Sequence, residues 1–215
     1  MNSHTQALTK ATQYLRQADE VMNRIIDGIG ACTMQIDPSP FRMLIRSIMG
    51  QQLSVAAAAT IWERFLDANG SKRVSPVSLA NLADTRLRRC GISHAKIRSI
   101  RDIQNAFGSN AVSVAKLRRL PDEEVKLTLM SLRGVGPWTG DMFLMFGLGR
   151  LNVVPVGDLG IANSIGTFYG DGSRASIQFI TGVAKHWSPY KSVASWYCWQ
   201  GLDLYRQGML EVTHP

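Results

Sequence analysis

Residues 132–140 read Leu-Arg-Gly-Val-Gly-Pro-Trp-Thr-Gly and lie between two apolar segments of helical periodicity. Gly134 and Gly136 let the backbone turn sharply, and Pro137 suits the first position of the helix that follows. The N–H groups and the positive end of that helix would then converge on one spot, as a phosphate site requires. An ordinary turn between two helices is the alternative, but the proline and Thr139 after the glycines favour a phosphate-binding turn.

Helical periodicity extends outward from this turn over almost the whole chain. Pro121 and the three acidic residues after it are typical of a helix start. Val153-Val154 is the only β-like run, and it is too short for a strand in a sheet. The sequence therefore predicts an all-α fold, with helices over residues 5–29, 41–49, 55–68, 76–90 (short helices), 93–107, 111–117, 121–131, 137–146, 160–169, 173–186 and 189–207.

Positive charge is concentrated in one part of this chain of 215 residues, whose formal net charge is +8. Residues 86–119 hold nine basic residues and one acid, Asp102, so this stretch carries the whole excess. Such a stretch favours a polyanionic partner, nucleic acid above all, although a solvated helix surface is the simpler alternative. Lys96 and Arg98 are among the residues expected to add salt-dependent affinity that is independent of nucleotide sequence.

Cysteine usage and the absence of long apolar runs limit the classes of protein. Cys32, Cys90 and Cys198 form no CxxC pair, which argues against a zinc finger, an iron–sulfur site and a disulfide framework. No signal peptide is visible, and no apolar run is long enough to span a membrane. We expect reduced thiols and an intracellular protein, cytoplasmic or nucleoid-associated in a bacterium and nuclear in a eukaryote.

A loop rich in glycine and proline follows the turn: Val154-Pro155-Val156-Gly157-Asp158-Leu159-Gly160. The chain resembles the helix-hairpin-helix (HhH-GPD) base-excision DNA glycosylases in the order of its parts: a helix, the pattern L-x-G-x-G, a second helix and then this loop. Within that superfamily the chain is most similar to the 3-methyladenine DNA glycosylase II (AlkA) type. The segments FRMLIRSIMGQQLSVAAAATIWERF, GISHAKIRSIRDI and WSPYKSVASWYCWQ agree with that type, so the resemblance covers roughly residues 40–205.

The resemblance implies two α-helical subdomains with DNA bound in the cleft between them. The first subdomain is expected over residues 1–40 plus 155–215, and the second over 41–154, with the hairpin at 132–136. The implied partner is double-stranded DNA that contains damaged bases, and no cofactor is required. We expect a monomer that does not associate with membranes.

Asp158 stands where the family has its catalytic aspartate, and it is also placed to cap a helix that starts near Leu159. A carboxylate beside C1′ stabilises an oxocarbenium-like sugar and orients water. Family members that also cut the DNA backbone carry a lysine two residues after the second hairpin glycine, where this chain has Trp138. The resemblance therefore implies a monofunctional glycosylase that leaves an abasic site. Asp141 is a weaker catalytic candidate, expected to face the helix dipole or solvent.

Alkylated purines carry positive charge, so they stack well on electron-rich rings and leave without a general acid. The resemblance assigns Trp138 and Trp187 to the base pocket, and Phe41 and Tyr190 are further candidates for it. For each of them a place in the hydrophobic core is the alternative. Trp196 and Trp199 are expected to be core residues.

The remaining site residues are also implied by the resemblance. Gln52 is expected to be the wedge that fills the gap left by an extruded base. Contacts to the DNA backbone are expected from Gly134, Gly136, Thr139, Ser54 and Lys191, with a helix cap as the alternative for Ser54. A structural Na⁺ or K⁺ is expected on the backbone carbonyls of Met130, Leu132 and Val135.

Two other functions stay open at this level. A non-catalytic module that recognises DNA damage would use the same fold and the same hairpin. A basic protein of the membrane surface is disfavoured because no helix combines a strongly apolar face with a Trp- and Lys-rich polar one. The preferred lesion, from 3-methyladenine to 7-methylguanine, ethenoadenine or hypoxanthine, depends on the shape of the pocket.

Overall fold

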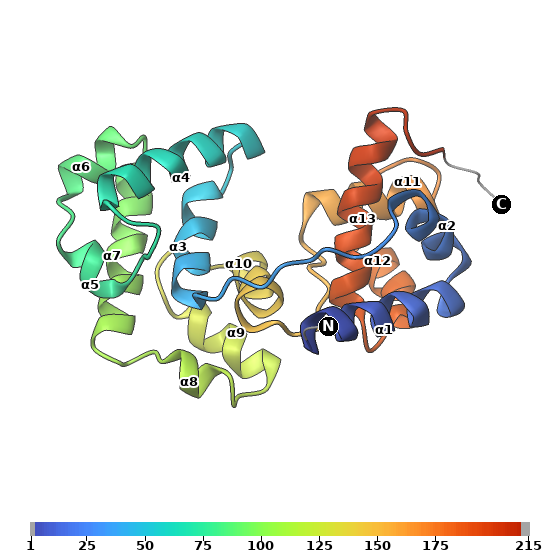
Figure 1. Ribbon diagram of the computed structural model, residues 1–215, viewed down its shortest axis with the longest axis horizontal. Coiled ribbons are helices and arrows are strands. Elements are labelled where there is room, and N and C mark those ends of the chain that lie inside the picture. The colour runs from blue at the N-terminus through green and yellow to red at the C-terminus, as the bar shows by residue number, and fades with distance from the viewer. Residues whose placement is uncertain (1–2, 212–215) are drawn as a thin grey trace. The chain divides into compact units, whose positions relative to one another are not determined.

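The computed structural model describes residues 3–211, and within this range helices joined by short loops account for the fold, without a β-strand (Figure 1). The all-α prediction is confirmed. The chain forms two compact units. Unit one contains the residues up to Gln35 and those from Arg150 onward, and unit two contains Ile36–Gly149. Both crossings lie five residues before the boundaries expected from the sequence. No helix in the described range is long and apolar enough to cross a bilayer.

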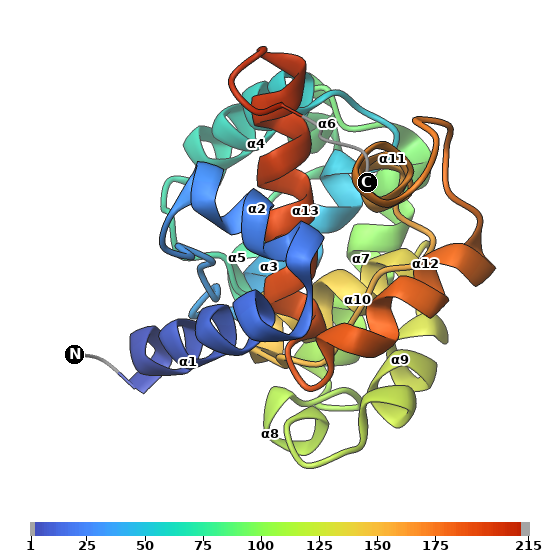
Figure 2. The ribbon, with the colours of Figure 1, turned by 90° about the vertical axis from the view of Figure 1, so that its right-hand side faces the viewer.

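Unit one is built around its last helix, α13, which packs against α1, α2 and α11 (Figures 1 and 2). Gly201 of α13 permits this packing, because a Cβ there would lie 2.9 Å from Cγ2 of Ile25 on α2. The helices of this unit are α1 (Ser3–Ala18), α2 (Glu20–Ile29), α11 (Leu159–Tyr169), α12 (Ile177–Val183), the 3₁₀-helix η2 (Ala184–Trp187) and α13 (Lys191–Arg206).

Two expected helices of unit one differ from the structure. The single helix expected over residues 5–29 is wrong, because the chain breaks at Asp19 and begins again as α2. Asp19 has an extended backbone and its carboxylate accepts the Met22 N–H at 2.9 Å, so a strong N-cap overrides continuous apolar periodicity. The helix expected over 173–186 starts only at Ile177, where Ser176 caps it.

Unit two is built around α3 (Pro40–Gly50), which packs against α4, α7, α10 and η1. Most of α3 is buried, as its apolar sequence predicts. The other helices are α4 (Val55–Asn69), α5 (Pro76–Ala80), α6 (Asp84–Arg89), α7 (His94–Gly108), α8 (Val114–Leu117), α9 (Asp122–Met130), α10 (Pro137–Met142) and the π-helix η1 (Phe143–Leu148). The continuous α-helix expected over 137–146 therefore changes to a π-helix after Met142.

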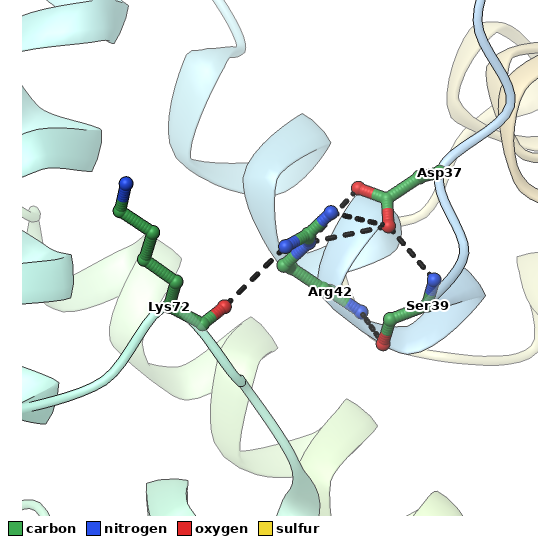
Figure 3. Close-up of polar contacts among 4 residues, drawn as sticks. All are labelled: Asp37, Ser39, Arg42 and Lys72. Atoms are coloured by element: carbon green, nitrogen blue, oxygen red, sulfur yellow. Dashed lines mark hydrogen bonds and ion pairs between the residues drawn. The ribbon is translucent and has the colours of Figure 1, made fainter.

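A polar cluster fixes the start of α3 (Figure 3). The Asp37 carboxylate accepts hydrogen bonds from the Arg42 guanidinium, with Nη2 at 2.8 Å, and from the Ser39 N–H at 2.8 Å. Ser39 in turn caps the helix by accepting the Arg42 N–H at 3.3 Å, and Arg42 Nη1 reaches the carbonyl of Lys72 at 3.4 Å. The forked guanidinium thus ties the entry of α3 to the loop after α4.

Candidate nucleic-acid interface and catalytic carboxylate

The hairpin loop, Ser131–Gly136, joins α9 to α10 in unit two. Its turn closes through a hydrogen bond from the Val135 N–H to the Leu132 carbonyl at 3.2 Å. Gly134 has φ +76°, and a Cβ there would overlap the Ser99 side chain. Gly136 has φ −104° and open space around it. The two glycines therefore serve different needs: Gly134 permits the turn and a close approach, whereas Gly136 leaves the backbone accessible.

The hairpin loop is held by side chains from other elements of unit two. Asp102 of α7 accepts the Arg133 N–H at 2.7 Å. The Gln51 amide donates to the Gly134 carbonyl and to the Thr139 hydroxyl, both at 3.0 Å. Thr139 was expected to donate to the DNA backbone, but it is only 1% exposed and its hydroxyl already has the Gln51 amide as a partner. Gln51 was not predicted from the sequence, because its partners lie more than eighty residues away.

The wedge loop, Gln51–Ser54, joins α3 to α4. Gln52 is exposed and has φ +58°, a left-handed conformation that side chains other than glycine rarely adopt. Leu53 and Val55 are also exposed, at 40% and 89%. Ser54 accepts the Ala57 N–H at 3.3 Å, which confirms that it caps α4. A strained polar residue beside two exposed apolar ones suits a loop that enters a base stack.

Lys96 of α7 has a structural role that was not expected. Its ammonium donates to the carbonyls of Met49 and Gln51 at 2.8 and 2.7 Å. Burial lowers the pKa of Lys96 below its ordinary value. The charge is therefore used at the carboxyl end of α3, where it complements the helix dipole, whereas Arg98 on the same helix is exposed and suited to a phosphate.

An ion pair joins the two helices of the hairpin. Lys126 Nζ of α9 lies 3.0 Å from Asp141 Oδ1 of α10, and Gly140 packs against the Lys126 side chain. Asp141 is 4% exposed, so of the two expected orientations, toward the helix dipole or toward solvent, the solvent-facing one is wrong. Burial raises the pKa of Asp141, and the neighbouring Lys126 only partly offsets this.

Asp158 lies at the N-terminus of α11 in unit one. Its Oδ1 accepts two N–H groups, that of Ile161 at 2.9 Å and the indole N–H of Trp199 at 2.8 Å. The predicted helix cap is confirmed. A Cβ on Gly160 would lie 2.8 Å from Trp199 Cδ1 and 3.0 Å from Asp158 Oδ1. Gly160 thus makes room for the indole, and the tryptophan assigned to the core instead orients the candidate catalytic carboxylate.

Two aromatic candidates for the base pocket are core residues in this structure. Trp187 is fully buried, and its indole N–H donates to Asp19 Oδ2 at 2.8 Å. Phe41 is 6% exposed and stands edge-on to Phe107, with ring centroids 5.3 Å apart. Both rings have packing partners that explain their presence without a ligand.

The other candidates are more accessible. Trp138 is half-buried at the second position of α10 in unit two. Tyr190 is half-buried in unit one, edge-on to Tyr14 at 5.3 Å, and precedes Lys191, the first residue of α13. Of the four aromatic candidates for the base pocket, Trp138 and Tyr190 therefore have the more accessible side chains.

The carbonyl groups expected to hold a monovalent cation lie within the hairpin: Met130 is the last residue of α9, and Leu132 and Val135 form the turn. The Leu132 carbonyl already accepts the Val135 N–H, which uses one of its two lone pairs. Oxygen donors of this kind fit a hard cation such as Na⁺ or K⁺. Within residues 3–211 no group of three His, Cys, Asp or Glu side chains is placed to hold a metal.

Residues 45–187 match the HhH-GPD superfamily of base excision DNA repair proteins. This match covers more than half of the chain and includes the hairpin loop, Trp138 and Asp158. The chain belongs to the HhH-GPD superfamily. The helix-hairpin-helix that gives the superfamily its name corresponds to α9, the hairpin loop and α10.

Proteins similar to this HhH-GPD chain are known from yeast and bacteria. The alkylbase DNA glycosidase-like protein mag2 of Schizosaccharomyces pombe is 28% identical over 93% of this chain and 96% of its own length. A DNA-3-methyladenine glycosidase structure from Bacillus halodurans has 32% identity and a TM-score of 0.77, covering 90% of this chain and 89% of that one. The S. pombe 3-methyladenine DNA glycosylase Mag1, in complex with abasic DNA, has 28% identity and a TM-score of 0.81, covering 89% and 95%.

Proposed function

We propose that this chain is a monofunctional DNA glycosylase that hydrolyses the N-glycosidic bond of alkylated purines in double-stranded DNA. The observation that carries the proposal is the Asp158 carboxylate, whose Oδ1 is held by the N–H groups of Ile161 and Trp199. The names of the similar proteins support the same activity, since they describe 3-methyladenine glycosylases and one of their structures contains abasic DNA.

DNA binding would begin at the hairpin loop. The N–H groups at the start of α10 and the accessible backbone around Gly136 suit a phosphate oxygen. Exposed basic residues such as Arg98 would add affinity that depends on salt but not on nucleotide sequence. We include the Na⁺ or K⁺ on the Met130, Leu132 and Val135 carbonyls in the proposal, where it would supply positive charge beside that phosphate.

The damaged base would leave the duplex before its bond to the sugar is broken. Gln52 on the wedge loop is exposed and would occupy the gap in the base stack. Trp138, half-buried at the start of α10, offers a ring face on which a positively charged purine stacks favourably. Selection of cationic purines would follow from this stacking and from the weakness of their glycosidic bond.

Bond cleavage requires no general acid when the base is already cationic. The electrons of the C1′–N bond go to the purine, and the sugar becomes oxocarbenium-like. The Asp158 carboxylate stabilises that positive charge, orients the water that adds to C1′ and accepts its proton. Trp138 stands where a lyase would have its lysine nucleophile, so no Schiff base forms. The products are a free purine and an abasic site in an uncut strand.

The decisive experiment compares base release from methylated duplex DNA by the wild type and by Asp158→Asn. An asparagine keeps an oxygen that accepts the Ile161 and Trp199 N–H groups, so the fold and DNA binding should be retained. We expect free 3-methyladenine from the wild type and at least about 100-fold slower release from the variant. Retained release by Asp158→Asn would show that another group catalyses the reaction.

Two further results of the same assay would change the proposed reaction. Binding without release by the wild type would instead indicate a non-catalytic module that recognises damaged DNA. A strand cut without alkali treatment would reveal lyase activity and contradict the monofunctional mechanism. The strand should remain intact until alkali cleaves it at the abasic site.

A further inference from the structure

The wedge loop and the hairpin loop are both contacted by one group of polar side chains within unit two. We call it the bridging cluster; its members are Gln51, Lys96, Ser99 and Asp102. The last three lie on α7 at three-residue spacing, which places them along one face of that helix. The face runs from the end of α3 to the hairpin loop, so a single helix contacts both loops.

One member of the cluster, Lys96, holds the first residue of the wedge loop. Lys96 donates to the Gln51 carbonyl at 2.7 Å and to the Met49 carbonyl at 2.8 Å. These bonds fix the backbone immediately before Gln52, whose φ of +58° is unfavourable for a side chain other than glycine. A conformation of this kind persists only where neighbouring contacts determine it. Lys96 is therefore part of what keeps Gln52 in place.

The other contacts reach the hairpin loop. Asp102 accepts the Arg133 N–H at 2.7 Å, and Ser99, only 6% exposed, packs against Gly134. The Gln51 amide closes the cluster by donating to the Gly134 carbonyl and the Thr139 hydroxyl. Gln51 thus contacts the phosphate-binding segment with its side chain while it directly precedes the wedge residue in the chain.

We propose that the bridging cluster fixes the distance between the hairpin loop and the wedge loop, so that anchoring a phosphate sets how far Gln52 enters the duplex. The proposal rests on the proposed function, because it assigns a purpose to the rigidity of two DNA-contacting loops. Gln51 and Lys96 are positioning residues in this scheme: neither touches the reacting atoms. Their loss should impair insertion of the wedge more than it impairs DNA binding.

The variants that test this idea are Gln51→Leu and Lys96→Met, which keep the approximate side-chain length and remove the hydrogen-bond donors. Gln13→Leu, at an exposed site on α1, is the control for the first. Lys10→Met, at an exposed site on α1, is the control for the second, because it removes one positive charge outside the basic stretch 86–119 and outside both loops. Thermal unfolding establishes that each variant is folded at the assay temperature.

The first readout does not depend on catalysis. A duplex carries 2-aminopurine beside an abasic-site analogue, and insertion of the wedge unstacks the 2-aminopurine and raises its fluorescence. At saturating protein we expect the wild type and both controls to give the full rise, and Gln51→Leu and Lys96→Met to give less than about half of it. Affinity of these two variants for undamaged duplex should stay within about threefold of the matched controls.

The second readout compares single-turnover release of 7-methylguanine placed opposite cytosine with release from the same base opposite an abasic-site analogue. We expect both variants to lose about tenfold on the paired lesion and less than about threefold on the unpaired one. Equal losses on the two substrates, or rates equal to those of the controls, would overturn the inference.

The two readouts separate the inference from the proposed function. If the wild type releases no base while the fluorescence pattern is as expected, the glycosylase proposal fails and the positioning role of the cluster stands. If the wild type releases base but the fluorescence of the variants equals that of the controls, the glycosylase proposal stands and the positioning role of the cluster fails. A flat fluorescence signal with the wild type itself would show that no wedge enters the duplex and would overturn the inference.

Discussion

Gly160→Ala tests whether the Trp199 indole orients the Asp158 carboxylate, the proposed catalytic group. Gly160 is the second residue of α11, two positions after the N-cap Asp158. A Cβ at this position would stand 2.8 Å from Trp199 Cδ1, 2.9 Å from Trp199 Nε1 and 3.0 Å from Asp158 Oδ1. Three contacts this short cannot coexist, so the indole, the carboxylate or both must move by several tenths of an ångström.

The effect on stability follows from two opposing contributions. Alanine is a better helix former than glycine by about 0.5–1 kcal/mol, whereas overpacking of this kind costs about 1–3 kcal/mol. Gly182→Ala on α12 is the matched control, because its Cβ would meet nothing within 4 Å. The difference between the two variants in unfolding free energy, measured with denaturant, should therefore be about 1–3 kcal/mol in favour of Gly182→Ala.

The effect on catalysis should be larger than the effect on stability. A carboxylate displaced by up to about 1 Å from its productive position costs about 10- to 100-fold in rate. We expect single-turnover base release by Gly160→Ala to fall by this factor, while Gly182→Ala reacts like the wild type. Wild-type rate and stability in Gly160→Ala would refute the role assigned to Trp199, since the close packing would then have no consequence for Asp158.

Three other outcomes follow from the structure. Gly134→Ala forces φ +76° on alanine and a clash with Ser99. In a denaturant titration it should lower the unfolding free energy by about 1–3 kcal/mol, and it should weaken binding to all duplexes alike. Gly136→Ala, with open space around it, should leave the unfolding free energy in the same titration within about 1 kcal/mol of the wild type. Burial raises the pKa of Asp141. The contribution of the protonated Asp141 carboxyl to stability is therefore fully present below the ordinary aspartate range and is lost as pH rises through the folded-state pKa. The unfolding free energy of the wild type minus that of Asp141→Asn should accordingly decrease from about pH 3 to pH 7. Gln52→Gly relieves the strain at φ +58° but adds unfolded-state entropy, so the unfolding free energy should change by less than about 1 kcal/mol. Base release from paired duplex should fall, because the wedge side chain is absent. An unchanged rate of release would exclude Gln52 as the wedge.

Local sequence signals predicted the parts of the fold that depend on neighbouring residues. The cap at Ser54 is confirmed, and the helix expected from residue 93 begins at His94 with Ser93 as its N-cap, because a cap satisfies backbone groups only three or four residues away. The same rule explains the main error in unit one. Asp19 is a stronger helix start than the apolar periodicity around it indicated, so one expected helix became two.

Contacts between distant segments could not be predicted in the same way. Gln51 lies 83 residues from Gly134, and Trp199 lies 41 residues from Asp158; neither pair leaves a periodic signal in the sequence. Lys96 was interpreted as one more basic residue of a charged surface, yet its ammonium is used inside unit two. Charge composition alone does not distinguish a cation that faces solvent from one that caps a helix.

The glycines of the site could be identified from the sequence, but only in part for the right reason. Gly134 was expected for its turn, and it also leaves room for Ser99. Gly160 carries no unusual backbone angle, so only the three-dimensional structure shows that Trp199 occupies the space of its missing side chain. In both places the absent Cβ lets a side chain from another helix approach the functional backbone or carboxylate. The proposed phosphate-binding turn and the proposed catalytic aspartate are thus each held by contacts within their own unit, which is the preorganisation that transition-state stabilisation requires.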